Sequence, residues 1–319
     1  MFQYFLFRIL SIIPILLVAS FVIFALLRLS GTDPITQYLI HSNLPQTQEL
    51  VESLRHEFGL DKPILQQYLM WLQQASRLDF GTSFITGRSV SNDFMYFLPN
   101  TFLLVGLSFL IILCVSIPLG ILSSKYKDKI PDLIIRFFCF IGVCIPNFWL
   151  AFVLIIIFAI YLDWLPALGL DSPQSFILPC LSISLMSSCI NTRLIRTNML
   201  EIRKERHIVY AKLRALDSKK ITLKHIFYNA SLPIVTAFGM HIGELIGGAL
   251  LIENIFAIPG IGLYSLQGIA NHDYPIIQCF VVVLCLAFVV CNLLVDMLLI
   301  ILDPRLRSEV MKSKQISDN

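Results

Sequence analysis

The feature that most constrains this chain is a set of six long apolar runs, each about the length needed to cross a bilayer. Roughly 20 helical residues span a hydrocarbon core of about 30 Å. Hydrophobic residues make up 56% of the 319 residues, whereas soluble domains are about 45–50% apolar. We therefore predict an all-α integral membrane protein with six transmembrane helices, at Ile9 to Leu29, Phe102 to Leu122, Phe137 to Tyr161, Phe176 to Arg196, Leu232 to Leu251 and Ile277 to Leu302.

The fourth run differs from the others because it carries many polar side chains. A polar side chain that faces lipid has no hydrogen-bond partner there, so a helix of this composition belongs inside a bundle. The sequence thus predicts that the other helices surround this run. Its polar residues are Ser182, Ser184, Ser187, Ser188, Asn191 and Thr192.

The distribution of Lys and Arg predicts which side of the membrane each connection faces. Loops rich in these residues stay in the cytoplasm. Two connections, 162–175 and 253–276, contain neither residue type. Both termini are therefore expected to be cytoplasmic, because the positive residues concentrate at Arg8, in 123–136, in 193–228 and in 303–319.

The segment 30–100, on the opposite side, has features of a small folded cap. Residues Ile64 to Leu72 are amphipathic at helical spacing, and Asp79-Phe80-Gly81-Thr82 has the composition of a turn. We expect an ordered extracytoplasmic segment that contains at least one short helix.

The long loop between the fourth and fifth runs contains ten Lys or Arg residues in 193–228 against three acidic residues. Ile208, Ala211 and Ala215 recur at helical spacing, and Asp217 or Ser218 can cap a second helix. Two short helices at an angle would present a projection to the cytoplasm. The alternative is a solvated basic loop that is attracted to anionic lipid headgroups.

This loop resembles that of the bacterial ABC importer permeases, in which small residues, a glycine and a downstream Leu-Pro dock on an ATPase. The matching strings are Tyr210-Ala211-Lys212-Leu213-Arg214-Ala215-Leu216-Asp217 and Asn229-Ala230-Ser231-Leu232-Pro233. The resemblance implies an ATPase-coupling loop over 197–231, with contacts from Tyr210, Ala211, Leu213, Ala215, Leu216 and Asp217.

The loop departs from the family pattern at one position, where Ala215 replaces the usual glycine. Because alanine tolerates a positive φ poorly, we predict that the chain bends at Asp217 instead. A charged or bulky residue at Ala211 or Ala215 is expected to disrupt docking on the ATPase and to leave membrane insertion intact.

The resemblance covers nearly the whole chain and is closest to the dipeptide, oligopeptide and nickel branch of these permeases. The motifs that carry it are Phe58-Gly59-Leu60-Asp61-Lys62-Pro63, Asp79-Phe80-Gly81-Thr82-Ser83, Ile145-Pro146-Asn147-Phe148-Trp149, Glu253-Asn254-Ile255-Phe256-Ala257-Ile258-Pro259-Gly260-Ile261-Gly262 and Asp303-Pro304-Arg305. It implies the type I importer permease fold. The implied parts are a first helix with an extracytoplasmic segment in 1–97, a transmembrane domain in 98–302 and a tail in 303–319.

The chain contains no GxxxxGK[ST] phosphate-binding sequence and no compact catalytic motif, so we do not expect an enzyme. We expect no cofactor on this chain, with ATP and Mg²⁺ used by other subunits. The resemblance implies two cytoplasmic ATPase subunits, a second homologous permease that forms a heterodimer with this chain, and an extracytoplasmic solute-binding protein. The cytoplasmic membrane of a bacterium is the expected location, and no nucleic-acid partner is expected.

Within the branch, the sequence is most similar to the first permease subunit of nickel importers. That similarity rests on Ser42-Asn43-Leu44-Pro45, Trp149-Leu150-Ala151-Phe152 and Gly239-Met240-His241-Ile242-Gly243-Glu244-Leu245-Ile246-Gly247-Gly248. Nickel, free or chelated, is the cargo that this resemblance implies. A dipeptide or oligopeptide permease of the same fold is the alternative, and an ATP-independent secondary transporter or channel is a third possibility.

The fifth run carries two stripes of residues with different chemistry. Gly239, Gly243 and Gly247 are four residues apart, which allows close packing against another helix. His241 and Glu244 lie on a second stripe, and a carboxylate within hydrocarbon costs at least about 2.5–3.5 kcal/mol.

Two interpretations of the second stripe stay open. Imidazole and carboxylate suit a borderline divalent ion such as Ni²⁺, so His241 and Glu244 are candidates for a transient metal site in the translocation path, to which we also assign Glu253. Alternatively, His241 and Glu244 bind each other or a neighbouring helix and only fix the packing of the bundle.

Overall fold

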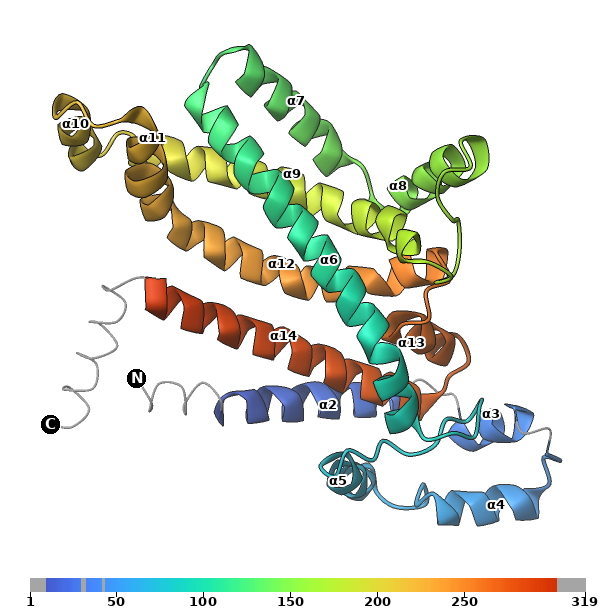
Figure 1. Ribbon diagram of the computed structural model, residues 1–319. Coiled ribbons are helices and arrows are strands. Elements are labelled where there is room, and N and C mark those ends of the chain that lie inside the picture. Colours follow the sequence, from blue (N-terminus) through green and yellow to red (C-terminus); the bar gives the residue numbers. More distant parts are fainter. Residues whose placement is uncertain (1–9, 30–32, 42–43, 303–319) are drawn as a thin grey trace, which may run out of the picture.

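The structure is a computed structural model that describes residues 10–29, 33–41 and 44–302. Within these ranges the chain is built from helices (Figure 1). Five are long and apolar enough to cross a membrane, and a sharply bent pair brings the number to six when it is counted as one span. The helical membrane fold is therefore confirmed. The start of the first run at Ile9 and the predicted tail 303–319 lie outside the described residues.

The bundle is organised around α9 (Ile177–Ile202), which follows the 3₁₀ turn η2 (Pro173–Phe176). It packs against α6 (Val90–Lys125) and α12 (Tyr228–Ile255), which are themselves candidate spans. By contrast, α2 (Ile12–Leu29) lies along α14 (Tyr274–Leu302) at one side of the bundle (Figure 1). The candidate spans differ in burial over an apolar window of 18 residues. In the span that contains α9, 67% of this window is buried inside the structure, whereas in α2 only 11% is buried.

The central position of α9 confirms the prediction made for the fourth run. All six of its serine, threonine and asparagine residues from Ser182 to Thr192 are buried. Several bond back to their own helix, since the Thr192 hydroxyl donates to the Ser188 carbonyl at 2.8 Å and the Asn191 amide donates to the Ser187 carbonyl at 2.8 Å. Such bonds satisfy polar groups where neither water nor lipid can.

The third run is not one continuous span, and the prediction of a single helix from Phe137 to Tyr161 is wrong. Helix α7 (Ile130–Cys144) ends before Pro146, and α8 (Asn147–Leu154) starts after it at an angle of 100° and continues as the π-helical turn η1 (Ile155–Tyr161). The residue before a proline is forced out of the helical region. Ile145 accordingly has φ −88° and ψ 119°.

The N-terminal cap, residues 33–41 and 44–89, is folded as predicted. It contains α3 (Pro34–His41), α4 (Gln48–Glu57) and α5 (Ile64–Ala75). The predicted turn is present, because Gly81 has φ +83° and its N–H donates to the Asp79 carboxylate at 2.9 Å. Aromatic side chains of the cap pack against α2. The centre of the Tyr68 ring of α5 lies 5.5 Å from the centre of the Phe24 ring of α2.

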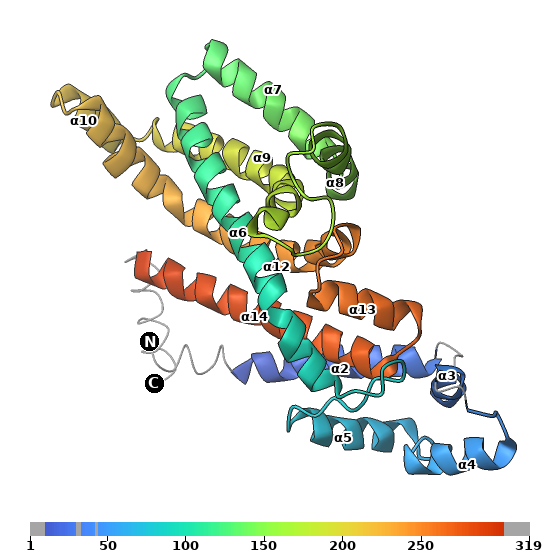
Figure 2. The same ribbon diagram turned by 45° about the vertical axis from the view of Figure 1, so that its right-hand side comes forward.

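The cap contacts the bundle near α13 (Ile261–Ala270) and the start of α14 (Figure 2). The Ser83 hydroxyl of the cap donates to the Asp273 carboxylate at 2.7 Å. Within the bundle, the Tyr264 hydroxyl of α13 donates to Asp93 of α6 at 3.1 Å. Arg88 lies 3.2 Å from Asp93 at the same junction. Burial raises the pKa of the Asp273 carboxyl because it disfavours the charged form. The hydrogen bonds that this carboxylate accepts act in the opposite direction.

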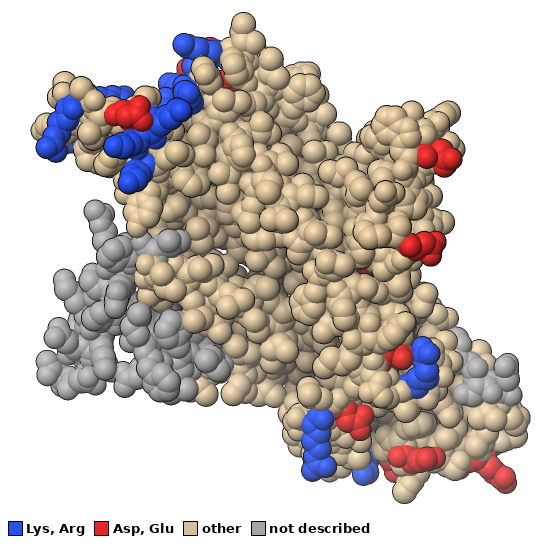
Figure 3. All heavy atoms as spheres, viewed as in Figure 1, with Lys and Arg blue, Asp and Glu red and all other residues tan. Residues whose placement is uncertain are grey.

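Basic side chains gather at the end of the bundle that carries the loop between α9 and α12 (Figure 3). The cap lies at the other end (Figure 1). The two ends therefore differ in charge as the positive-inside rule expects of opposite membrane faces. The cytoplasmic location of the termini, which fall outside the described residues, stays a prediction.

Candidate functional site

The loop between α9 and α12 folds into a helical projection. Helix α10 (Arg206–Leu213) is followed by a turn, and α11 (Ser218–Lys220) then continues through the π-helical turn η3 (Ile221–Phe227) into α12. Asp217 caps α11, because its carboxylate accepts a hydrogen bond from the Lys220 N–H at 3.3 Å. The prediction that Asp217 or Ser218 starts a second helix is thus confirmed.

The turn itself corrects the sequence prediction. Ala215 adopts φ +52°, the left-handed conformation that we expected it to avoid. Asp217 has an ordinary φ of −56°. The chain therefore bends at Ala215 itself, even though this residue carries a methyl group. A left-handed conformation costs a residue with a Cβ about 1–2 kcal/mol.

The side chains of this projection divide into a buried and an exposed set. Ala211 is only 6% exposed and packs into the main hydrophobic core with Ile208 and Ile221. A bulky group at Ala211 would therefore disturb the loop itself, so the expected effect of such a change is not confined to docking. The exposed apolar residues, which we call the coupling knob, are Val209, Tyr210, Leu213 and Leu216.

Replacing Ala215 by glycine is expected to raise the stability of the protein. The change removes the strain of a Cβ at positive φ, and the greater flexibility of glycine in the unfolded chain offsets part of the gain. We expect a net gain of up to about 1 kcal/mol in the free energy of unfolding, measured by denaturation in detergent. The matched control is Ala237→Gly in the helical interior of α12, which should lose about 0.5–1 kcal/mol. If Ala215→Gly lowered the free energy of unfolding as much as Ala237→Gly, the backbone at Ala215 would not be strained.

On α12, His241 and Glu244 lie together, as their spacing predicted. Nδ1 of His241 is 2.6 Å from Oε2 of Glu244. The imidazole is buried, whereas the Glu244 side chain is 62% exposed at the surface of the chain. Among the described residues, no group of three or more His, Cys, Asp or Glu side chains is placed to hold a metal ion. The pair therefore offers at most two ligands from this chain.

Two of the three glycines of the predicted stripe on α12 face a neighbouring helix. A methyl group at Gly239 would overlap Val295, and one at Gly243 would overlap the ring of Phe288, both on α14. These two glycines let α12 and α14 approach closely. Gly247 differs, because no other group lies within 4 Å of the position that its Cβ would take. It therefore faces open space in this single chain.

Glu253 has a structural environment that the sequence did not reveal. Its carboxylate is fully buried and accepts hydrogen bonds from the backbone N–H groups of Gly262 at 2.7 Å and Leu263 at 3.1 Å. The Thr101 hydroxyl also donates to it. Gly262 and Leu263 are in the first turn of α13, where N–H groups have no partner in the helix and favour an anion. The carboxylate thus caps α13 from another helix.

The same contact explains part of the motif that follows Glu253. A Cβ at Gly260 would overlap the Glu253 carboxylate, and one at Gly262 would overlap the backbone of Leu250. The chain can pass this closely only with glycine at both positions. Because these groups enclose Glu253, its geometry favours a structural role. Its place in the translocation path stays a prediction.

Sequence reasoning missed the partners of these acidic residues. Thr101 contacts Glu253 from α6, and Ser83 contacts Asp273 from the cap. No local pattern marks either hydroxyl, since the residues in each pair are more than 150 positions apart in the chain. The apolar surroundings of each acid in the sequence are the only signal that a partner exists, because a buried carboxylate without a partner is costly.

Two family models match the chain. The model described as "Binding-protein-dependent transport system inner membrane component" matches residues 116–308, and its N-terminal companion matches residues 1–105. The matched ranges include α9, the coupling knob and the histidine–glutamate pair.

Curated relatives extend over almost the whole chain. The metal-staphylopine import system permease protein of Staphylococcus aureus is 37% identical over 309 residues, covering 96% of this chain and 99% of the relative. The oligopeptide transport system permease protein of Bacillus subtilis is 34% identical, with coverage of 94% and 97%. The glutathione transport system permease protein of Pectobacterium atrosepticum is 31% identical, with coverage of 96% and 99%.

These relatives are transport permeases, and the matched family describes components that depend on a binding protein. Membership therefore implies an ATPase and a solute-binding protein as partners. It also fits the helices that are long enough to cross a membrane. The chain belongs to the family of inner membrane components of binding-protein-dependent transport systems, the multi-pass permease subunits of ABC importers.

Proposed function

We propose that this chain is one of two homologous permease subunits of an ABC importer that moves nickel, free or chelated, into the cytoplasm by alternating access. The observation that carries the proposal is the histidine–glutamate pair on α12, with the Glu244 carboxylate exposed within an apolar helix. Two ATPase subunits would supply the energy at the coupling knob. A solute-binding protein would deliver the cargo at the end that carries the cap.

The exposure of Glu244 supports a second permease. A carboxylate facing lipid at this depth would be costly, so another subunit or water must lie against this face of α12. The exposed residues form a continuous stripe at helical spacing, which is typical of a face that a further helix covers. The stripe consists of Pro233, Thr236, Met240, Glu244, Gly247 and Leu251. We propose that the equivalent face of the second permease lies opposite, with the path between them.

The chemistry of the pair supports a metal cargo. An imidazole nitrogen and a carboxylate oxygen are both ligands that borderline divalent ions accept. Two ligands bind an ion weakly, which suits passage because a tightly held ion is not released. The similarity to a permease named for metal-staphylopine import also supports a metal or a metal chelate.

A peptide cargo is the second candidate, and the relatives named for oligopeptide and glutathione transport favour it. The two candidates differ in which solute the intact importer accumulates. Uptake of labelled nickel and of a labelled dipeptide, measured in a strain that lacks the importer and carries this chain with its partners, separates them. Accumulation of the dipeptide without nickel would replace the first candidate by the second.

Exchanging both polar groups of the pair is expected to lower nickel uptake at least tenfold. His241→Gln with Glu244→Gln keeps the side chains of similar size and removes the imidazole and the charge, so an ion loses both proposed ligands. The matched control is Thr236→Val, on the same exposed stripe two turns earlier, which should leave uptake unchanged. Copurification of the partner subunits verifies assembly. Full nickel uptake by an assembled double variant would show that the pair only fixes packing.

A further inference from the structure

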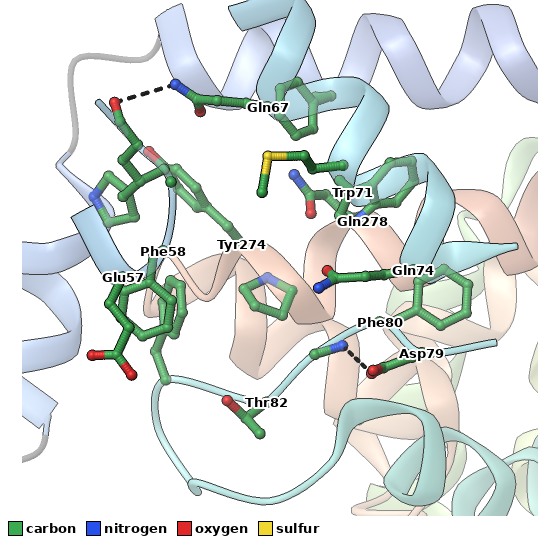
Figure 4. A pocket seen from close by; sticks show the side chains of 18 of the residues that line it. Glu57, Phe58, Gln67, Trp71, Gln74, Asp79, Phe80, Thr82, Tyr274 and Gln278 are labelled. Carbon is green, nitrogen blue, oxygen red and sulfur yellow. Dashed lines mark hydrogen bonds between the residues drawn. The ribbon is translucent and has the colours of Figure 1, made fainter. Parts of the chain in front are cut away.

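Two pockets at opposite ends of the molecule differ in the charges that line them. A cavity of about 390 Å³ lies between the cap and the bundle, and its wall carries the carboxylates of Glu57 and Asp79 (Figure 4) as well as the guanidinium of Arg28. A pocket of about 170 Å³ lies at the opposite, basic end, and all of its charged side chains are lysines. A wall with one sign of charge favours a ligand of the opposite sign. The wall of this basic pocket consists of Ile121, Lys125, Ser218, Lys219, Thr222 and Leu223.

The basic pocket lies between the end of α6 and the helical segment that leads into α12. Lys125 is the last residue of α6, and Ile121 lies one turn before it. The rest of the wall comes from α11 and η3, which continue directly into α12. The pocket therefore joins two parts of the chain that meet only after the bundle has folded.

Neither lysine of the pocket has an acidic partner among the described residues. Lys125 and Lys219 are both exposed, and none of the ion pairs in the described part of the chain includes either of them. The nearest acids in the sequence have other contacts, since the Asp217 carboxylate caps α11 and Asp128 lies 3.6 Å from Lys127. An anion at the pocket would therefore be attracted by two charges that no described acid neutralises.

The position of the pocket along α6 fits the level of the lipid phosphates. The apolar run of this helix is predicted to end at Leu122, so Lys125 lies at the membrane edge, where long basic side chains reach the headgroups. Basic loops face the cytoplasm, and the cytoplasmic leaflet has a negative surface potential that comes from anionic lipids. Lysine binds a phosphate as a point charge. The depth and the charge of the pocket thus both match a lipid phosphate.

Apolar side chains beside the lysines distinguish a lipid from a free anion. Leu223 is 54% exposed, and Ile121 is partly exposed. A free phosphate ion gains nothing from apolar neighbours, whereas a phospholipid carries apolar chains next to its phosphate. The exposed hydroxyl of Ser218 adds a hydrogen-bond donor for a phosphate oxygen. The residues of the coupling knob are absent from the wall, so the pocket is separate from that surface.

We propose that the basic pocket binds an anionic phospholipid of the cytoplasmic leaflet, with the phosphate at Lys125 and Lys219 and the start of the acyl chains at Ile121 and Leu223. Bound there, the lipid joins the end of α6 to the segment that leads from the coupling knob into α12. The site shares no residue with the stripe of α12 that we assign to cargo passage, and it does not depend on whether the cargo is nickel.

The test is photolabelling of the complete importer, in phosphatidylcholine nanodiscs, by a phosphatidylglycerol that carries a diazirine next to its headgroup. The matched lipid is a phosphatidylcholine with the same diazirine and acyl chains, at the same mole fraction. Mass spectrometry of the peptides that contain residues 121–125 and 218–223 measures the labelling. We expect at least tenfold more labelling by the phosphatidylglycerol, because both lysines attract its negative charge. Lys125→Gln with Lys219→Gln should lower that labelling at least fivefold, and Lys125→Arg with Lys219→Arg should retain it.

The matched control is Lys204→Gln with Lys224→Gln, which removes the same charge from the basic loop outside the pocket wall and should leave the labelling unchanged. Equal labelling by the two lipids, or labelling that survives the loss of both pocket lysines, would overturn the proposal. Loss of labelling in potassium phosphate but not in potassium chloride of equal ionic strength would also overturn it, since the pocket would then hold free phosphate.

Labelling that appears only when the ATPase subunits are removed would overturn the proposal as well, because the ATPase would then cover the pocket. Both glutamine changes replace exposed side chains, so the thermal unfolding temperature of that variant should stay unchanged. This measurement separates lost binding from lost folding, and the comparison of the two lipids on the unchanged chain depends on no variant.

Discussion

Replacing Leu213 by aspartate is expected to abolish ATP-driven uptake, with a loss of at least tenfold. Leu213 is 76% exposed in the coupling knob, and an apolar side chain that is exposed to water indicates a surface that a partner covers. Burying an unpaired carboxylate in that contact costs several kcal/mol, and about 1.4 kcal/mol already changes an equilibrium tenfold. The measurements are uptake by the complete importer and the amount of ATPase that copurifies with this chain.

The control for this change is Leu65→Asp, a leucine of α5 that is 61% exposed in the cap, away from the basic loop. It adds the same charge at a similar exposure, so the ATPase should copurify as with the unchanged chain. Leu213→Met should retain both readouts, because the knob stays apolar and of similar size. Normal uptake by an importer that carries Leu213→Asp would show that the knob is not the coupling surface.

Replacing Asp132 by alanine is expected to lower the free energy of unfolding by about 3–5 kcal/mol. Asp132, at the start of α7, is fully buried and binds Arg196 of α9 through two bonds of 2.7 Å, from Nε and from Nη2. The hydroxyl of Ser123 and the N–H of Asp128 also donate to it. Without the carboxylate, the Arg196 guanidinium would stay largely buried with its main partner lost. Denaturation in detergent micelles measures the change.

The double variant Asp132→Leu with Arg196→Leu is the matched control for that ion pair. Replacing both charges by apolar groups removes the uncompensated charge, and such replacements are often neutral. We therefore expect the double variant to regain most of the stability that Asp132→Ala loses. If Asp132→Ala unfolds at the same denaturant concentration as the unchanged chain, the pair does not hold α7 to α9.

The spans were predictable because lipid leaves few structural choices. Any segment in the membrane must satisfy its own backbone hydrogen bonds, so apolar length alone indicates a helix. The interior position of α9 could also be predicted, since buried serines and asparagines would have no partners on the lipid face. The break at Pro146 was readable in principle, because its effect on the residue before it is local. The apolar run continues on both sides of the break, since α7 and α8 are both apolar, and its length therefore suggested a single helix.

The details of the candidate sites could not be predicted, for two physical reasons. The first is long-range pairing: the Thr101 hydroxyl and the carboxylate of Glu253 meet only after α6 and α12 pack. The second is tertiary override of local preference. Ala215 adopts a positive φ because Asp217 begins the next helix and the turn must close between two helices. By contrast, the contact between His241 and Glu244 follows from helical spacing alone.

Nickel transport by the purified importer tests the proposed function most directly. The complete importer would be reconstituted in proteoliposomes with its binding protein, and labelled nickel that enters the lumen would be counted with and without ATP on the side of the ATPase subunits. We predict uptake that requires ATP and that is lost when the ATPase subunits are omitted. Nickel entry at an equal rate without ATP, or through this chain alone, would contradict an ATP-driven permease.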